Sequence, residues 1–243
     1  MTNTAKAVLG VVYPYDSDID DELSLFLPEN VQLRSAHTPA TTEDITMELI
    51  ARMSLNSDIE EAAAELVPYQ PGCIAYAGTA TSFSRGLGCD RDISHRIEAR
   101  TSVPATTTST SMVRALKALG VQKVAVGAPY PSEVNAALQA FLEASGLVVA
   151  QLSGLDLARA TEIGELSLTD VADLIRSAYS PESEAVFVSC TGIRAATIIE
   201  DLEEELGIPV LSANQVTIWD GLRVMGIEEM PSDRGRLFRV ANG

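Results

Sequence analysis

The sequence predicts an α/β fold of two similar halves, each a four-stranded parallel sheet with helices on both faces. Short apolar runs alternate with segments of helical spacing along the 243 residues, a pattern typical of parallel sheets. The pattern also restarts: residues 123–131 align with 6–14 at an offset of 117, and residues 189–191 align with 77–79 at an offset of 112. Several matches in the same order indicate a duplication. A pseudo-twofold axis would place the corresponding loops face to face across a cleft, where we expect the active site.

The first half begins with an apolar strand over residues 6–12, which Tyr13, Pro14 and Tyr15 close. The acidic segment 16–27 follows as a helix, since acidic residues favour a helix N-terminus. We further expect strands over 31–35, 72–77 and 103–107, helices over 45–66 (interrupted near 56–58), 90–100 and 109–119, and a polar loop over 37–44 that could overhang a site.

The second half repeats this order. It is expected to contain strands over 123–131, 185–188 and from 207, and helices over 170–179, 195–206 and 217–224. The predicted domains are a first α/β lobe over 1–118, a second over 119–225, and a tail over 226–243 that returns to the first lobe or is loosely held. The last helix of the first lobe could pack on the second.

Composition narrows the possible partners. A formal net charge of −17 argues against binding to nucleic acid or to an anionic membrane surface. No apolar run has the length of a membrane span, and the first residues lack the pattern of a signal peptide. Three cysteines without paired spacing suit reduced thiols, so a cytoplasmic protein is expected, as a monomer or small homo-oligomer. The cysteines and histidines lack metal-ligand spacing, so no metal is expected.

The candidate site lies where four segments meet at the predicted strand ends: 13–15, 78–80, 130 and 189–192. Their hydroxyls and turn amides would converge and none is cationic, which is typical of a carboxylate pocket built without arginine. Cys190 would stand above the N-terminus of the next helix, whose dipole favours a thiolate. A thiol can give or take a proton at carbon, and Gly78 occupies the place opposite Cys190, so protons would arrive from one face only. Alternatively, Cys190 is one more buried apolar residue.

These segments resemble the aspartate/glutamate racemase superfamily, which includes maleate cis-trans isomerases and arylmalonate decarboxylases. The resemblance covers nearly the whole chain. Its marks are Tyr13-Pro14, the run from Gly78 to Phe83, Tyr130 followed by Glu133-Val134-Asn135, and Val188-Ser189-Cys190. Racemases and isomerases of this superfamily usually have a cysteine in both loops. Gly78 and Cys190 look like the decarboxylase branch, which has glycine in the first loop and one cysteine in the second.

The resemblance implies a role for each matched residue. Thr79, Tyr130 and the turn amides after Cys190, including those of Thr191 and Gly192, would hold a carboxylate and the enediolate formed when carbon dioxide leaves. Cys190 would protonate this carbanion, the departing carboxylate would lie among apolar side chains, and no metal, biotin or coenzyme A is implied. Pro14 and Tyr15 would shape the wall. Ala80 stands where the decarboxylases have serine, and Thr191 where they have glycine.

Three functions stay open at this point. The first is a cofactor-independent decarboxylase of a substituted malonate, a carbon–carbon lyase that acts through Cys190. The second is a cis-trans isomerase or racemase of a small dicarboxylate, and the third is a non-catalytic protein that binds such dicarboxylates. Thr79 could instead cap a helix, and Tyr130 could be a core aromatic residue. Cys73, Cys89, His37 and His95 lie away from the predicted strand ends and are expected outside the site.

Overall fold

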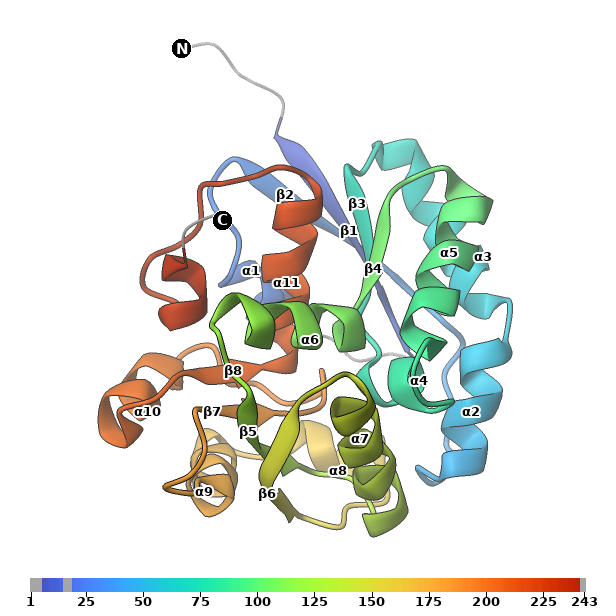
Figure 1. Ribbon diagram of the computed structural model, residues 1–243. Helices are drawn as coiled ribbons and strands as arrows, with labels where there is room; N and C mark the ends of the chain where they lie inside the picture. Colours follow the sequence, from blue (N-terminus) through green and yellow to red (C-terminus); the bar gives the residue numbers. More distant parts are fainter. Residues whose placement is uncertain (1–5, 15–18, 241–243) are drawn as a thin grey trace.

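The computed structural model describes residues 6–14 and 19–240 and confirms an α/β fold with two four-stranded parallel sheets (Figure 1). The strand order is β2-β1-β3-β4 in the first sheet and β6-β5-β7-β8 in the second, so the two halves repeat one topology. The strands are β1 (Ala7–Tyr13), β2 (Val31–His37), β3 (Cys73–Tyr76), β4 (Ala105–Thr107), β5 (Lys123–Ala128), β6 (Val148–Gly154), β7 (Ala185–Val188) and β8 (Val210–Ser212).

Helices connect the strands in each half. In the first half they are α1 (Asp20–Ser24), α2 (Met47–Leu55), α3 (Asp58–Leu66), α4 (Thr79–Phe83), α5 (Cys89–Thr101) and α6 (Thr108–Ala118), with a 3₁₀ turn, η1 (Val67–Tyr69). In the second half they are α7 (Ser132–Ala144), α8 (Ala160–Gly164), α9 (Leu168–Ala178), α10 (Ile199–Leu206) and α11 (Ala213–Val224), followed by η2 (Arg236–Arg239). None of the helices in the described part is long and apolar enough to cross a bilayer.

The first sheet buries both of its faces, as the apolar strands predict. Val12, Ile74 and Tyr76 point to the face that α3 and α5 cover, where they form a separate apolar cluster. Leu9 and Val11 alternate with them and belong to the main core, which extends into the second half of the chain. The two halves therefore share one continuous core.

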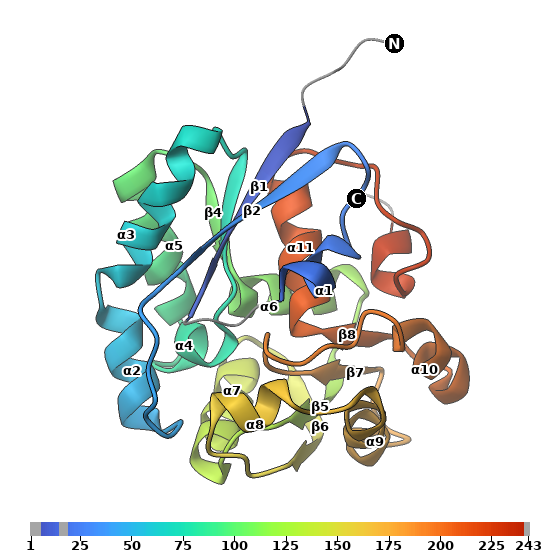
Figure 2. The ribbon, with the colours of Figure 1, turned by 180° about the vertical axis from the view of Figure 1, so that it is seen from behind.

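Helices α6 and α11 lie side by side between the two sheets (Figures 1 and 2). Buried polar contacts join them: Thr108 and Thr217 share a hydrogen bond of 2.7 Å between their hydroxyls, and Asp220 accepts from Thr106 at 2.6 Å and from Ser111 at 3.1 Å. Because buried polar groups are costly to leave unpaired, these bonds fix how the halves sit on each other. The cleft between them is thus defined by packed helices.

Residues 226–240 pack on both halves. The ring of Phe238 stacks on that of Phe26 with centroids 5.8 Å apart, and Leu237 is fully buried. The carboxylate of Glu203 accepts the backbone N–H of Arg236 at 2.8 Å. The division of the chain at residues 118 and 225 stays a prediction.

One predicted helix begins later than expected. Helical spacing predicts a helix from residue 195, directly after the Cys190 turn, whereas α10 begins at Ile199 and residues 189–198 form irregular turns. In contrast, α4 begins at Thr79, immediately after the corresponding loop of the first half. Strand β6 and helices α7 and α8 were not expected from the sequence.

Candidate active site

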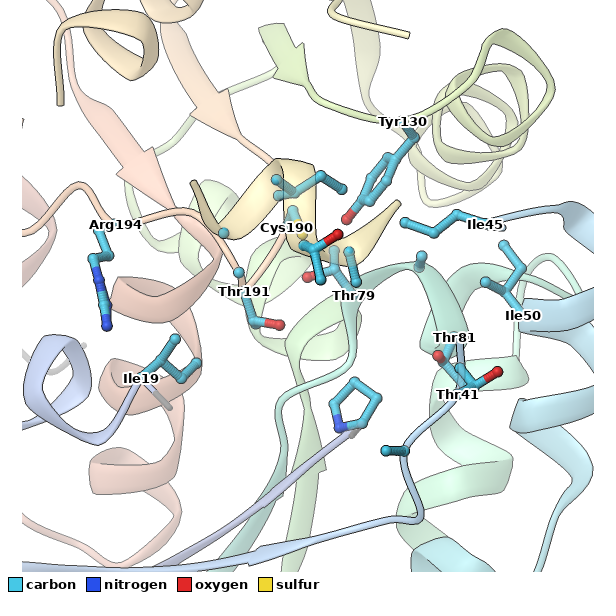
Figure 3. A pocket seen from close by; sticks show the side chains of 18 residues that line it. Ile19, Thr41, Ile45, Ile50, Thr79, Thr81, Tyr130, Cys190, Thr191 and Arg194 are labelled. Atoms are coloured by element: carbon cyan, nitrogen blue, oxygen red, sulfur yellow. The ribbon is translucent and has the colours of Figure 1, made fainter. Parts of the chain in front are cut away.

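A cavity of about 400 Å³ opens between the halves, at the ends of the strands (Figure 3). Its lining is mostly small or apolar, with several hydroxyls. The lining residues are Pro14, Ile19, Ala40, Thr41, Ile45, Ile50, Thr79, Ala80, Thr81, Tyr130, Ala160, Thr161, Ile163, Gly164, Cys190, Thr191, Gly192 and Arg194. The structure thus brings together segments from both halves, including most of the residues that the sequence singles out.

Cys190 sits in a tight turn after β7 with a backbone φ of 92°. Residues other than glycine rarely adopt this region, and they do so at a cost of about 1–3 kcal/mol that the surrounding structure must offset. The N–H of Ile193 donates to the carbonyl of Cys190 at 3.2 Å, and the N–H groups of Gly192 and Ile193 and the hydroxyl of Tyr130 lie close enough to the sulfur to lower the pKa of the thiol. The turn therefore aims the thiol into the cavity among neutral donors.

The expected influence of a helix dipole on Cys190 is wrong, because no helix begins at this turn. Burial raises the pKa of the thiol, and the three hydrogen bonds from Gly192, Tyr130 and Ile193 only oppose this effect. Cys190 is therefore a protonated thiol at neutral pH, suited to giving a proton. The same bonds would stabilise the thiolate that remains after the proton has left.

Two distant side chains hold this turn and explain why the helix begins late. The amide of Asn214, on α11, donates to the carbonyls of Thr191 at 3.1 Å and Ile193 at 2.9 Å. The buried carboxylate of Glu22, on α1, accepts the N–H groups of Ala195 and Ala196 at 2.7 and 2.8 Å. These bonds satisfy the backbone groups outside a helix. Burial raises the pKa of Glu22, against the bonds from these two N–H groups and the charge of Arg194.

Tyr130 and Thr79 lie beside the thiol. The phenol of Tyr130 is buried, which raises its pKa well above 10, and its oxygen accepts a hydrogen bond from Ser189 at 3.4 Å. In Figure 3 the hydroxyl of Tyr130 points toward Cys190 and Thr79. The Thr79 hydroxyl is buried and has no partner of ordinary hydrogen-bond geometry among the described residues, but it lies close enough to the Tyr130 oxygen to lower the pKa of that phenol. It is thus the neutral donor with capacity for a ligand.

Thr191 ties the two loops to each other. Its hydroxyl donates to the carbonyl of Ala77 at 2.8 Å, so the residue before Gly78 touches the residue after Cys190. The sequence predicts Thr191 as a binding residue, and it does line the cavity, but its hydrogen is engaged in this contact. The N–H of Ile193 is likewise engaged, by the carbonyl of Cys190, and the N–H of Gly192 lies close to the sulfur.

The other predicted site residues divide into three groups. Pro14, Ala80 and Gly192 line the cavity. Gly78 lies at the N-cap of α4, directly behind Thr79 and outside the lining. Tyr15 lies outside the described residues.

One expectation about charge is wrong. The sequence predicts a pocket without a cationic residue, whereas Arg194 belongs to the lining. Its guanidinium pairs with Asp21 at 3.2 Å, and Figure 3 shows it beside Ile19, apart from the group around Cys190. Sequence reasoning missed Arg194 because it assigned only residues 189–192 of this turn to the site. The end of the cavity around Cys190 and Tyr130 is thus lined by neutral groups, and Arg194 lies on one side of the lining.

Sequence reasoning also missed most of the apolar wall. Ile45 follows directly on the polar loop that was expected to overhang a site, and its N–H donates to the carbonyl of Ala158 at 2.7 Å. Ile163 and Gly164 come from the short helix α8, which no periodic pattern announces. The loop and α8 both contribute residues to the lining of the cavity.

Cys73, Cys89, His37 and His95 lie outside the cavity lining. Cys73 and Cys89 are buried in the cores. In the described ranges, no group of three or more His, Cys, Asp or Glu side chains is placed to hold a metal ion.

Residues 43–238 match the family described as arylmalonate decarboxylase. The chain is 31% identical to the arylmalonate decarboxylase of Bordetella bronchiseptica over 155 residues, which is 63% of this chain and 65% of that protein. It is 28% identical to the maleate isomerase of Nocardia farcinica over 196 residues, 76% of each chain.

Solved structures share the fold. A liganded arylmalonate decarboxylase variant, with a glycine replaced by cysteine and a cysteine by serine, superposes with a TM-score of 0.88 at 24% identity, over 96% of this chain and 99% of that one. A maleate isomerase variant from Pseudomonas putida S16, solved with maleate, gives 0.86 at 21% identity over 97% and 98%. A Nocardia farcinica maleate isomerase variant with a cysteine replaced by serine carries a covalently bound succinylcysteine intermediate; its TM-score is 0.85 at 24% identity, over 97% and 99%.

Proposed function

Because the chain belongs to the arylmalonate decarboxylase and maleate isomerase family of the Asp/Glu racemase superfamily, we propose that it is a cofactor-independent decarboxylase of a substituted malonate. One observation favours decarboxylation over the other candidate functions. Of the three cysteines in the sequence, Cys190 lines the cavity, Cys73 and Cys89 are buried in the cores, and the facing loop has Gly78. A lone, protonated thiol suits delivery of one proton to one face of a carbanion.

The retained carboxylate of the substrate binds at the neutral end of the cavity. The Thr79 hydroxyl, which lacks a partner of ordinary geometry among the described residues, donates to one oxygen. The single hydrogen of Tyr130 turns from the sulfur to the substrate as charge develops there. Fixed neutral donors in a buried site stabilise the growing negative charge more than they stabilise the initial carboxylate.

The departing carboxylate faces the apolar wall that includes Ile45, Ile50 and Ile163. A carboxylate among such side chains loses hydration, and this cost disappears when it leaves as neutral carbon dioxide. The bond between the central carbon and this carboxyl breaks, and its electron pair passes into the retained carboxylate to form an enediolate. No electron acceptor is needed for this step.

Cys190 completes the reaction. Its S–H bond breaks, the proton forms a C–H bond at the central carbon, and the electron pair stays on sulfur. The N–H groups of Gly192 and Ile193 stabilise this thiolate until solvent returns the proton. Because the proton comes from one side, the product of a disubstituted malonate is a single enantiomer.

The test is a panel of mono- and disubstituted malonates with aryl and alkyl groups, scored for carbon dioxide release and for product chirality. Cys190→Ala should lower kcat by at least about 10³-fold while the protein stays folded. Cys73→Ala, at a buried cysteine away from the cavity, is the matched control and should keep kcat within a few-fold. Full activity in Cys190→Ala would rule the mechanism out.

Isomerisation of a small dicarboxylate is the second candidate, because the maleate isomerase of Nocardia farcinica aligns with 76% of this chain and the Bordetella bronchiseptica decarboxylase with 63%. Here Cys190 would act alone as the nucleophile on the double bond. Incubation with maleate, followed by NMR, distinguishes the two: fumarate without carbon dioxide release supports isomerisation.

A further inference from the structure

The ring of Tyr76 leaves no room for a side chain at position 78. A Cβ atom placed on residue 78 would lie 2.5 Å from Cε1, 2.6 Å from Cζ and 2.8 Å from Oη of Tyr76. Real Cβ atoms essentially never approach other heavy atoms this closely, so one of the two groups would have to move. The φ of Gly78 is −130°, so the restriction comes from Tyr76 and not from the backbone conformation.

The backbones of Tyr76 and Gly78 are both held by the elements they belong to. Tyr76 ends β3, pairs with Val12 and Thr107 on the two neighbouring strands, and is fully buried in the cluster under α3 and α5. Its ring packs in that cluster and also lines a second cavity of about 200 Å³, next to the loop over residues 38–43. Gly78 is fixed as well, because its carbonyl accepts the N–H of Ser82 at 2.9 Å and so begins α4.

Gly192, the other glycine near Cys190, has room for a side chain. A Cβ on Gly192 would meet Ile163 Cγ2 at 3.5 Å and Cys190 Sγ at 3.6 Å, which are ordinary van der Waals contacts. A side chain is therefore excluded sterically at Gly78 but not at Gly192.

We propose that the ring of Tyr76 fills the volume that a side chain at position 78 would need and so bars a second proton donor from the loop that faces Cys190. This rests on the proposed function, in which Cys190 gives the only proton. Tyr76 is a positioning residue: it acts through the identity of residue 78 and needs no contact with substrate.

A thiol at position 78 would add a defined reaction. One sulfur, as thiolate, takes the α-proton of the product acid and becomes S–H. The other, as thiol, gives its proton to the opposite face and becomes the thiolate. Bonds and charge balance without a redox partner, and the net result is racemisation with exchange of the α-hydrogen for solvent hydrogen.

The steric claim is tested by a thermal-unfolding cycle of Gly78→Ala, Tyr76→Val and the double variant. We expect Gly78→Ala to lower Tm by at least about 4 °C in the presence of Tyr76 and by much less in the Tyr76→Val background. Gly192→Ala is the matched control for stability and should shift Tm by a small amount only. Equal losses in both backgrounds would overturn the proposal.

The functional claim is tested by adding the product acid in D₂O to Gly78→Cys and to Tyr76→Val/Gly78→Cys. The double variant should exchange the α-hydrogen and racemise the acid at least tenfold faster than either the wild type or Gly78→Cys alone. A stable Gly78→Cys protein that racemises as fast as the double variant contradicts the proposal. If the wild type releases no carbon dioxide from malonates, the proposed function fails, and the Tm cycle still decides the role of Tyr76.

Discussion

The loops after β3 and β7 occupy corresponding places in the two halves, yet they are held in different ways. After β3, Gly78 caps α4 and the chain enters a helix at once. After β7, Cys190 has a φ of 92° and the chain stays irregular until Ile199. The first loop is thus fixed by its own helix, whereas the second depends on Asn214 and Glu22 from other elements. The loop after β3 therefore has an ordinary backbone conformation, whereas the loop after β7 carries both the strained backbone and the thiol.

Among the tests of this difference, removal of the Asn214 amide should have the largest effect. Asn214→Ala takes the donor from two buried carbonyls of the Cys190 turn, so we expect a loss of about 2–4 kcal/mol in the free energy of unfolding. Displacement of the thiol should also lower kcat by about 10²-fold. Urea unfolding and steady-state kinetics measure both.

Gln215 is the matched control, since it is a fully buried amide on the same helix that donates to the carbonyl of Arg234 instead. Gln215→Ala should destabilise the fold with little change in kcat. If both variants lose kcat equally, Asn214 has no special role in placing Cys190.

Removal of the Glu22 carboxylate should have a somewhat smaller effect. Glu22→Ala leaves the N–H groups of Ala195 and Ala196 without their acceptor, at the far end of the irregular stretch. We expect a loss of about 2–3 kcal/mol and about a tenfold loss of kcat, again by urea unfolding and kinetics. Asp21→Ala, one residue earlier on α1 and exposed, should be close to wild type in stability. Wild-type kcat in Glu22→Ala would show that the Cys190 turn keeps its conformation without the Glu22 carboxylate.

The pH profile tests the protonation state of Cys190. The thiol gives its proton only while protonated, and burial raises its pKa above the ordinary 9.0. We therefore expect kcat to stay high through pH 9 and to fall only at more alkaline pH. The folded state also binds this proton more tightly than the unfolded chain, so its contribution to stability is lost as pH rises through the raised pKa. A rate that falls between pH 7 and 8 would contradict a protonated donor.

Local signals in the sequence were enough to predict the duplicated strands and the main polar residues of the site. Buried strands such as β3 and β7 are continuous apolar runs, and their ends mark Thr79 and Cys190. Strand β6 has no buried residue in its pattern, so it lacks this signal and was missed. The five-residue helix α8 is too short for periodicity, which hid Ile163.

The Cys190 turn could not be predicted for another reason. Residues 195–206 have helical spacing, and locally nothing prevents a helix from beginning there. Its delayed start depends on Glu22, which lies 173 positions from Ala195, and on Asn214. Such tertiary bonds override local propensity and leave no periodic trace. The same error placed Cys190 above a helix dipole.

The smallest expected effect isolates the strain at Cys190. Cys190→Gly and Cys190→Ala both remove the thiol, but only glycine adopts a φ of 92° without a Cβ clash. Glycine also loses more entropy on folding, so the net advantage of Cys190→Gly over Cys190→Ala should be about 1 kcal/mol, measured by urea unfolding. Glycine is favoured over alanine at position 78 as well, but for a different cause: φ there is −130°, and alanine is disfavoured by the Tyr76 ring alone. Equal stability of the two Cys190 variants would mean that the turn relaxes once the sulfur is gone, so that the hydrogen bonds to sulfur, and not Asn214 and Glu22, impose its conformation.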